Sequence, residues 1–100
     1  MAVKVLITRL LKPGALVDAA LALSQLRGQA MVQPGYISGE TLVSRDEPNK
    51  LVVVSTWDSF EDWRRWRDNP LRAAGEGRLE NYLASPVGYE VFNMGVRPES

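Results

Sequence analysis

Residues 50–67 read KLVVVSTW-DS-FEDWRRWR, and this stretch decides the fold. Its first part, Lys50–Trp57, is rich in β-branched residues and predicts a strand, and the run of valines indicates burial on both faces. Asp58-Ser59 before two acids is typical of a helix start, because a short side chain accepts hydrogen bonds from free backbone N–H groups there. A helix is therefore predicted over residues 60–67, directly after the strand.

The segments on either side predict the remaining elements. Each has a hydrophobic period of about two or 3.6 residues and ends at Pro, Gly or Asn. They comprise strands over residues 3–11, 36–45 and 87–94 and helices over about 14–32 and 71–83. The polar loop Asp46-Glu47-Pro48-Asn49 joins two of the strands as an antiparallel hairpin, and Gly75 and Gly77 weaken the last helix.

This order predicts an α+β domain of the ferredoxin-like βαββαβ class, with a four-stranded antiparallel sheet and its helices on one face. Residues 1–100 form a single domain, in which 97–100 are a frayed end. The other face of the sheet is left uncovered. Since a valine-rich strand is poorly suited to water, we expect that face to meet the same face of a second copy, giving a homodimer.

Two residue types are absent, and their absence excludes several kinds of chemistry. The chain contains no Cys and no His. Disulfides, thiolate metal sites, a Ser-His-Asp triad, His-ligated zinc and a haem with a proximal His are therefore excluded within it. Twelve basic and twelve acidic residues cancel, so no nucleic-acid partner is expected.

The N-terminal residues give no sign of export. They lack a long apolar core followed by a small-residue cleavage site, and the apolar segment 15–26 is too short to span a bilayer and is interrupted by Asp18, Ser24 and Gln25. The sequence therefore predicts a cytoplasmic protein that does not enter the membrane.

Residues 57–70, which follow Pro34-Gly35-Tyr36 and the hairpin, carry a family resemblance. This pattern resembles the antibiotic biosynthesis monooxygenase superfamily of dimeric α+β barrels, which also includes haem-degrading monooxygenases. The resemblance extends over about residues 3–93 and is more specific for the fold than for an activity. It implies a dimeric α+β barrel and a small monooxygenase.

The haem-degrading branch uses an Asn on the first strand, a Trp on the second helix and a downstream His that ligates iron. By motif, these positions fall on Thr8, on Trp66 and near Gly75-Glu76, where no His exists. Because two of the three residues are missing, haem degradation is not expected.

The quinone-forming branch needs no cofactor and holds an aromatic substrate between helices and sheet. The resemblance implies pocket residues that are polar or aromatic, with Trp and Tyr or Arg among them. The candidates are Thr8, Tyr36, Trp66, Arg72 and Tyr82. No catalytic residue, metal ligand or cofactor is assigned, and a buried carboxylate such as Glu40 or Glu76, or the substrate's own acidity, would replace a histidine base.

The helix over residues 60–67 has an aromatic side and a charged side. Phe60 and Trp63 are predicted to pack in the core, whereas Trp66 fits the core and a pocket wall equally well. The basic residues Arg64, Arg65 and Arg67 fit a solvated helix face, with ion pairs Glu61–Arg65 and Arg64–Asp68.

Three functions remain open on this scaffold. One is cofactor-independent oxidation of an aromatic or phenolic substrate in a pocket between sheet and helices. The alternative is a non-catalytic ligand-binding or accessory dimer. The third is a purely structural dimer whose pocket is filled by its own side chains.

Overall fold

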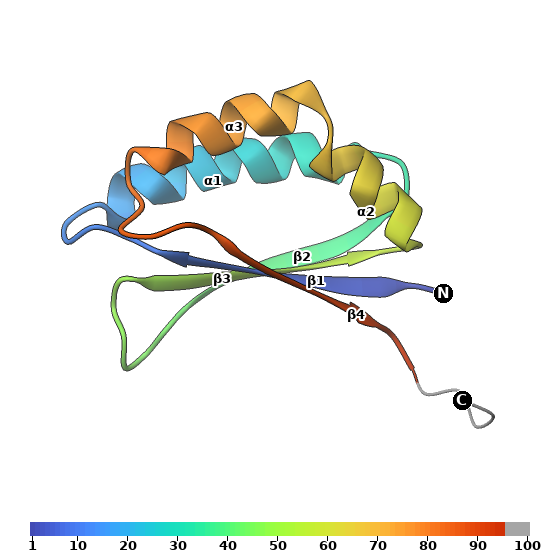
Figure 1. Ribbon diagram of the computed structural model, residues 1–100, viewed down its shortest axis with the longest axis horizontal. Coiled ribbons are helices and arrows are strands. Elements are labelled where there is room, and N and C mark those ends of the chain that lie inside the picture. Colours follow the sequence, from blue (N-terminus) through green and yellow to red (C-terminus); the bar gives the residue numbers. More distant parts are fainter. Residues whose placement is uncertain (96–100) are drawn as a thin grey trace.

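Strands and helices follow one another in the predicted order in the computed structural model, which describes residues 1–95 (Figure 1). The elements are β1 (Val3–Leu10), α1 (Leu16–Met31), β2 (Tyr36–Val43), β3 (Lys50–Trp57), α2 (Phe60–Arg67), α3 (Pro70–Glu80) and β4 (Gly88–Asn93). Every predicted element is confirmed, and the largest difference is that α3 ends at Glu80 rather than at residue 83. The frayed end predicted over residues 97–100 lies outside the described residues.

The four strands form one antiparallel sheet in the order β2-β3-β1-β4. β1 is central, and its Val3 lies opposite Trp57 of β3 and Asn93 of β4. All three helices lie on the same side of the sheet, as Figure 1 shows, and the opposite side carries none of them. The predicted ferredoxin-like α+β fold is confirmed.

Short polar side chains start the second and third helices, as the sequence predicts. The Ser59 hydroxyl oxygen accepts a hydrogen bond from the Asp62 backbone N–H, with an N–O distance of 3.2 Å. The Asn69 side-chain oxygen accepts from the Leu71 N–H at 2.9 Å, and Pro70 occupies the first turn of α3. These caps satisfy backbone donors that have no partner within their helix.

The core lies between the sheet and the helices. It contains Val3, Val5, Ile7, Leu11, Ala15, Ala19, Leu23, Leu26, Ala30, Leu51, Trp57, Trp63, Trp66 and Leu79. Trp63 is a core residue as predicted, but the same prediction for Phe60 is wrong, because its side chain is 41% exposed. Each step of three residues turns about 60° around a helix, so Phe60 and Trp66 point about 120° apart and do not share one buried side.

The helix-free face of the sheet is mainly aliphatic at its centre. Because directly opposed residues share a face, the register places Leu6, Thr8, Val52 and Val54 on it together. Val52 and Val54 are half-buried in the single chain, so the two-sided burial predicted for the valine run is only partial within one copy. We refer below to this side as the bare face.

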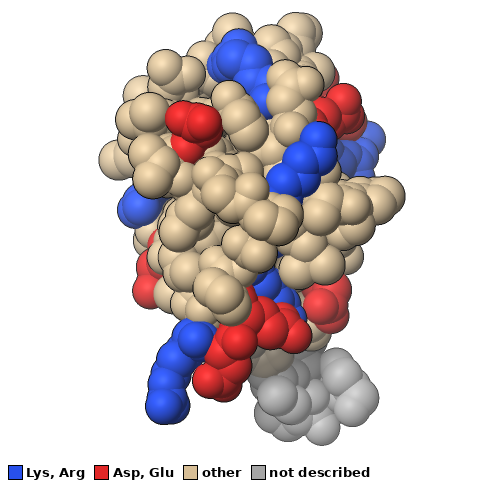
Figure 2. Space-filling view, turned by 90° about the vertical axis from the view of Figure 1, so that its left-hand side faces the viewer, with Lys and Arg blue, Asp and Glu red and all other residues tan. Residues whose placement is uncertain are grey.

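Figure 2 shows the end of the molecule at the left of Figure 1, where the turn between β1 and α1 lies near the segment from α3 to β4. Most of this surface is uncharged. Basic and acidic side chains lie close together at its lower end, at the level of the β2–β3 hairpin. This side therefore presents no continuous basic surface of the kind that a nucleic-acid backbone requires.

Candidate functional site

A pocket of about 60 Å³ lies between the helices and the sheet, at the side where α1 passes over β2. The first four elements of the chain, β1, α1, β2 and β3, line this pocket together with one residue of α3. The lining residues are Ile7, Arg9, Leu23, Leu26, Arg27, Ala30, Tyr36, Gly39, Glu40, Thr41, Val53, Ser55, Trp57 and Glu76. Its walls are mostly apolar, so the few polar groups decide what it recognises.

Arg9 is the most deeply buried of those polar groups, with 1% of its surface exposed. It comes from β1, whose alternate residues Val3, Val5 and Ile7 face the helices. Since side chains of a strand alternate between faces, Arg9 continues this inward series. A guanidinium is thereby placed at the end of an apolar stripe.

Glu76 of α3, in the helix layer, contacts Arg9 of the sheet. Its carboxylate oxygen Oε1 accepts a hydrogen bond from Arg9 Nη2, and Arg72 Nη2 reaches the same oxygen at 3.3 Å. Arg72 and Glu76 lie four residues apart on α3, which brings them onto one side of the helix. Arg72 Nη2 also donates to the Tyr89 hydroxyl of β4 at 2.9 Å. These four residues, here called the arginine cluster, join three elements.

Close approach of α3 to α1 makes this meeting possible. A Cβ atom on Gly75 would lie 2.5 Å from Leu26 Cδ1 of α1, which is closer than packed atoms allow. Only glycine permits that spacing without a shift of Leu26. The glycine that weakens α3 as a helix former therefore allows α3, which carries Glu76, to lie close to α1.

Aromatic rings run from the pocket to the arginine cluster. Tyr36 packs edge-on against Trp57 with ring centroids 5.3 Å apart, and Trp57 lies 6.0 Å from Trp63. The Arg72 guanidinium carbon lies 5.1 Å from the centroid of Trp63 and 5.4 Å from that of Tyr89. These contacts hold Arg72 in place by cation–π attraction. The attraction is strengthened because Arg72 is only 6% exposed and is therefore shielded from solvent.

The arginine cluster carries one uncompensated positive charge. Arg9 and Arg72 are both cationic, whereas Glu76 supplies a single carboxylate whose side chain is 15% exposed. In addition, Arg9 Nε is buried without a hydrogen-bond partner within residues 1–95. A buried donor left unpaired costs about 1–3 kcal/mol, so the pocket keeps an unmet preference for a hydrogen-bond acceptor.

The mouth of the pocket is bridged by Arg27 of α1, whose Nη2 donates to the Gly39 carbonyl oxygen of β2 at 2.6 Å. A neighbouring hollow of about 220 Å³ shares three residues with the pocket: Leu23, Arg27 and Thr41. Arg27 is exposed and lies at the boundary between the two hollows. If its side chain turned outward, the two hollows would form one groove between α1 and β2.

The structure brings together only some of the predicted site residues. Tyr36 lines the pocket, and Arg72 lies one contact away through Glu76. Thr8 lies on the bare face, because it is paired with Val52 and alternates with the inward residues of β1. Trp66 is buried in the core and Tyr82 packs against the core beyond the end of α3, and neither lines the pocket.

Arg9 is a buried pocket residue that was not among the predicted candidates, although the sequence carries a signal for it. The motif match placed the first-strand position on Thr8, but Val3, Val5 and Ile7 define the inward side, which continues to Arg9. Of the two carboxylates considered as a base, Glu76 is largely buried at the cluster, whereas Glu40 is exposed and lies opposite Val54, on the bare face.

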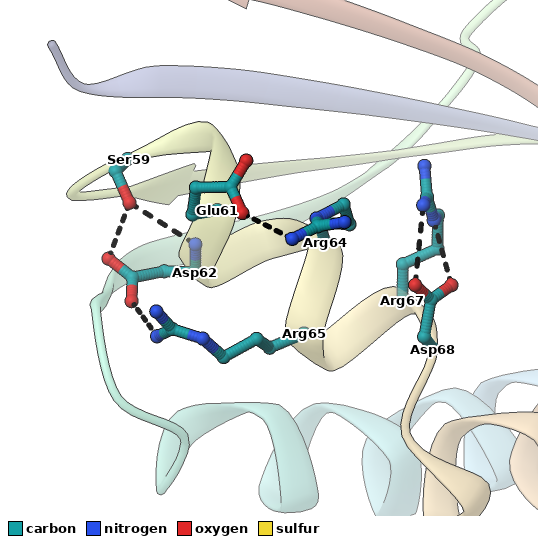
Figure 3. Close-up of polar contacts among 7 residues, drawn as sticks. All are labelled: Ser59, Glu61, Asp62, Arg64, Arg65, Arg67 and Asp68. Atoms are coloured by element: carbon teal, nitrogen blue, oxygen red, sulfur yellow. Dashed lines mark hydrogen bonds and ion pairs between the residues drawn. The ribbon is translucent and has the colours of Figure 1, made fainter.

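The basic residues of α2 do not belong to the pocket. They form ion pairs in the close-up of Figure 3, which are Arg64–Glu61, Arg65–Asp62 and Arg67–Asp68. The predicted solvated face is confirmed, but the predicted partners are wrong, because these pairs are three or one residues apart instead of four. The hydrogen bond from Arg67 lowers the pKa of the Asp68 carboxyl and raises the pKa of Arg67, and both residues are exposed.

Residues 1–95 contain neither a cluster of metal-ligating side chains nor a helix that could span a membrane. No three or more His, Cys, Asp or Glu side chains of this part of the chain are grouped so that they would hold a metal ion. Its helices are also too short or too polar to cross a membrane.

A four-stranded antiparallel sheet with helices on one face and a largely apolar pocket between the layers defines an α+β domain with a candidate ligand pocket. The chain belongs to the antibiotic biosynthesis monooxygenase family, whose model matches residues 2–76. That match includes both Arg9 and Glu76. Among curated proteins, no sequence match is found.

Several solved structures share the fold. SnoaB, a cofactor-independent oxygenase from Streptomyces nogalater, has a TM-score of 0.84 at 18% identity, over 99% of this chain and 98% of that protein. Rv0793 from Mycobacterium tuberculosis has a TM-score of 0.85 at 18% identity, over 98% and 99%. A protein of Caulobacter crescentus CB15, provisionally described as an antibiotic biosynthesis monooxygenase, has 0.88 at 14% identity, over 95% and 91%. At such identities the likeness concerns the fold alone.

Proposed function

We propose that this protein is a small cofactor-independent monooxygenase that oxidises an aromatic or phenolic substrate in the pocket between α1 and the sheet. The observation that carries the proposal is a mostly apolar pocket that ends at the buried arginine cluster. Family membership and the shared fold with SnoaB, described as a cofactor-independent oxygenase, support it.

The chemistry balances without a further reductant. A phenol that carries hydrogen opposite its hydroxyl group reacts with one O₂ to give a quinone and one water. One oxygen atom forms the new C=O bond and the other leaves as water, and the ring supplies all four electrons. The reaction starts when the substrate loses its O–H proton and becomes electron-rich, which favours a site that stabilises negative charge on oxygen.

Flat apolar walls suit such a ring. Trp57 and Tyr36 supply aromatic surface, and Ile7 and Val53 cover the sheet below. The pocket is smaller than the roughly 300–1,000 Å³ that is usual for ligand sites. Substrate entry therefore requires Arg27 to leave the Gly39 carbonyl and open the groove that continues along α1.

Oxygen uptake with a panel of phenols and quinol precursors tests this function. With ¹⁸O₂, we expect one labelled oxygen in the product and one in water. Ala30 is buried and lines the pocket, so Ala30→Leu should fill it and lower kcat/KM by at least about tenfold, a loss of about 1.4 kcal/mol in transition-state stabilisation. Ala74→Leu adds the same side chain at an exposed site of α3 and should leave turnover unchanged.

The outcome separates the proposal from its alternative. If the phenols bind and Ala30→Leu weakens that binding, but no oxygen is consumed, the protein is a non-catalytic ligand-binding dimer on this scaffold. If none of the phenols binds to the folded protein, the pocket is not a ligand site for this class of compound.

We further propose that the protein acts as a homodimer in which the bare faces of two copies meet. The central strands place aliphatic residues there, and the register puts Glu40 and Glu90 of the outer strands beside them. An apolar centre with a charged rim is the usual composition of a protein–protein interface. The same contact would cover Val52 and Val54, which one copy leaves half-exposed.

A further inference from the structure

We propose that Arg9 forms an oxyanion site, which makes the pocket select aromatic ligands whose hydroxyl group has lost its proton. This inference rests on the proposed function, since it takes the same pocket as the ligand site. It goes further by naming the charge state of the ligand and the atom that recognises it, Arg9 Nε.

The first observation is the unpaired donor. Arg9 lines the pocket with 1% of its surface exposed, and one of its terminal nitrogens is already bound to Glu76. Its Nε has no partner among the described residues. Among the described residues, Gln29 Oε1 is the other buried side-chain atom without a hydrogen-bond partner, but Gln29 does not line the pocket. Buried polar atoms are nearly always paired in native proteins, so a free donor on a residue that lines a hollow suits an acceptor that the ligand brings.

The second observation is the net charge around that donor. Two guanidiniums share one carboxylate, so the arginine cluster remains cationic. Two other charged residues among the described ones line the pocket, Arg27 and Glu40, and both are exposed; the register directs Glu40 to the bare face with Val54. Glu80 borders a separate groove that Glu76 also lines. Water screens those exposed charges more strongly than the buried ones. A nearby buried cation favours the ionised form of an acid, so a bound phenol becomes phenolate.

The third observation is the apolar lining, which restricts what kind of anion fits. Leu23, Leu26 and Val53 offer no hydrogen bonds to a small hydrated anion such as inorganic phosphate. A ring that carries one oxyanion satisfies both parts of the site, because its carbon atoms contact the walls while its oxygen accepts from Arg9.

This arrangement accounts for the absence of a histidine base. Only the O–H bond of the ligand breaks in this step, its electron pair stays on the oxygen, and the proton passes to Glu76 or to solvent. No electron is transferred until O₂ reacts. The arginine cluster would thereby raise the acidity of the substrate, so that deprotonation does not need the imidazole base that other enzymes use to accept the proton.

Absorbance titration with 4-nitrophenol under nitrogen tests the inference, because phenolate and phenol absorb at different wavelengths. We expect the bound compound to have a pKa lower by about one unit, which corresponds to about tenfold tighter binding of the phenolate. The methyl ether 4-nitroanisole, followed by competition, should bind at least about tenfold more weakly than 4-nitrophenol at a pH where the latter is ionised.

Arg9→Met should abolish this preference while leaving the ether's affinity unchanged. Arg78→Met removes the same charge from an exposed site of α3 and should preserve the preference. If Arg9→Met does not fold, Arg9→Lys retains the charge without the Nε–H, and we expect it to keep part of the preference. Equal binding of phenol and ether by the folded wild type and by Arg9→Met would overturn the oxyanion site but leave the pocket as a ligand site. Binding of neither compound would remove the proposed function as well.

Discussion

The two faces of the sheet carry different chemistry although the same strands supply both. On the helix side, β1 and β3 contribute apolar residues together with a buried guanidinium, Arg9, which pairs with a carboxylate of α3. On the bare face, the same two strands present aliphatic residues such as Leu6 and Val54 near their centre, with Lys4 and Lys50 toward opposite ends. A charged group buried on one face suits recognition of a ligand, whereas an aliphatic face suits contact with another apolar surface. Substitutions on the two faces should therefore act on different properties of the protein.

The largest effect should follow from truncating a tryptophan on the helix side. Trp66 is 4% exposed in the core, so Trp66→Ala should lower the free energy of unfolding by about 3–5 kcal/mol, as is usual when a large buried side chain is removed. Urea denaturation measures this change. Phe60→Ala on the same helix removes a half-exposed ring and should cost less than about 1.5 kcal/mol. Similar losses in both variants would contradict the division of α2 into a buried and an exposed side.

A charge on the bare face should act on association instead of on folding. Val52→Asp places two carboxylates in the proposed interface, one from each copy, and should raise the dimer dissociation constant by at least about 100-fold, or about 2.7 kcal/mol. Analytical ultracentrifugation, with circular dichroism as the check on folding, measures this.

Val17→Asp is the matched control, because Val17 is 72% exposed on α1, away from the sheet. It should leave the dimer intact. Thr8→Lys, on the bare face beside Val52, provides a second test if Val52→Asp does not fold. A wild type that is monomeric at all concentrations would end the dimer proposal.

A smaller effect should come from the two glycines of α3, of which Gly75 lies against α1 and Gly77 faces open space. Gly75→Ala introduces a methyl group against Leu26 and should destabilise the protein by about 1 kcal/mol, since the crowding outweighs the gain in helix propensity. A Cβ on Gly77 meets nothing within 4 Å, so Gly77→Ala should stabilise by about 0.5–1 kcal/mol. Thermal unfolding of the two variants gives the comparison, and equal shifts would argue against the close approach of α1 and α3.

The smallest effect should come from the exposed ion pairs of α2. Glu61→Gln removes the partner of Arg64, and both side chains are more than half exposed. Such pairs contribute about 0–1 kcal/mol, and we expect a change below about 0.5 kcal/mol in the free energy of unfolding. A larger loss of unfolding free energy would mean that the Glu61–Arg64 pair stabilises the fold more than an exposed ion pair usually does.

Much of the fold was predictable because its signals are local. The valine run and the Ser59 start predicted β3 and α2 with the bounds that the structure has. The exposed position of Phe60 was not predicted, because spacing along a helix does not show how far its buried side extends around it. The site was predicted less well. Tyr36, Arg72 and Glu76 were among the candidates, but motif matching chose Thr8, and alternation along β1 selects Arg9.

By itself, the sequence determined the order of elements, the inward and outward residues of β1, and the absence of thiol and imidazole chemistry. These properties depend on the hydrophobic period and on composition, which belong to short segments or to the chain as a whole. The tertiary structure alone decided that Arg9 meets Glu76, 67 residues away, and that one donor stays unpaired there. The contact between Arg9 and Glu76 depends on the strand register and on the close approach of Gly75 to Leu26. Packing between segments far apart in the sequence determines the register and this approach.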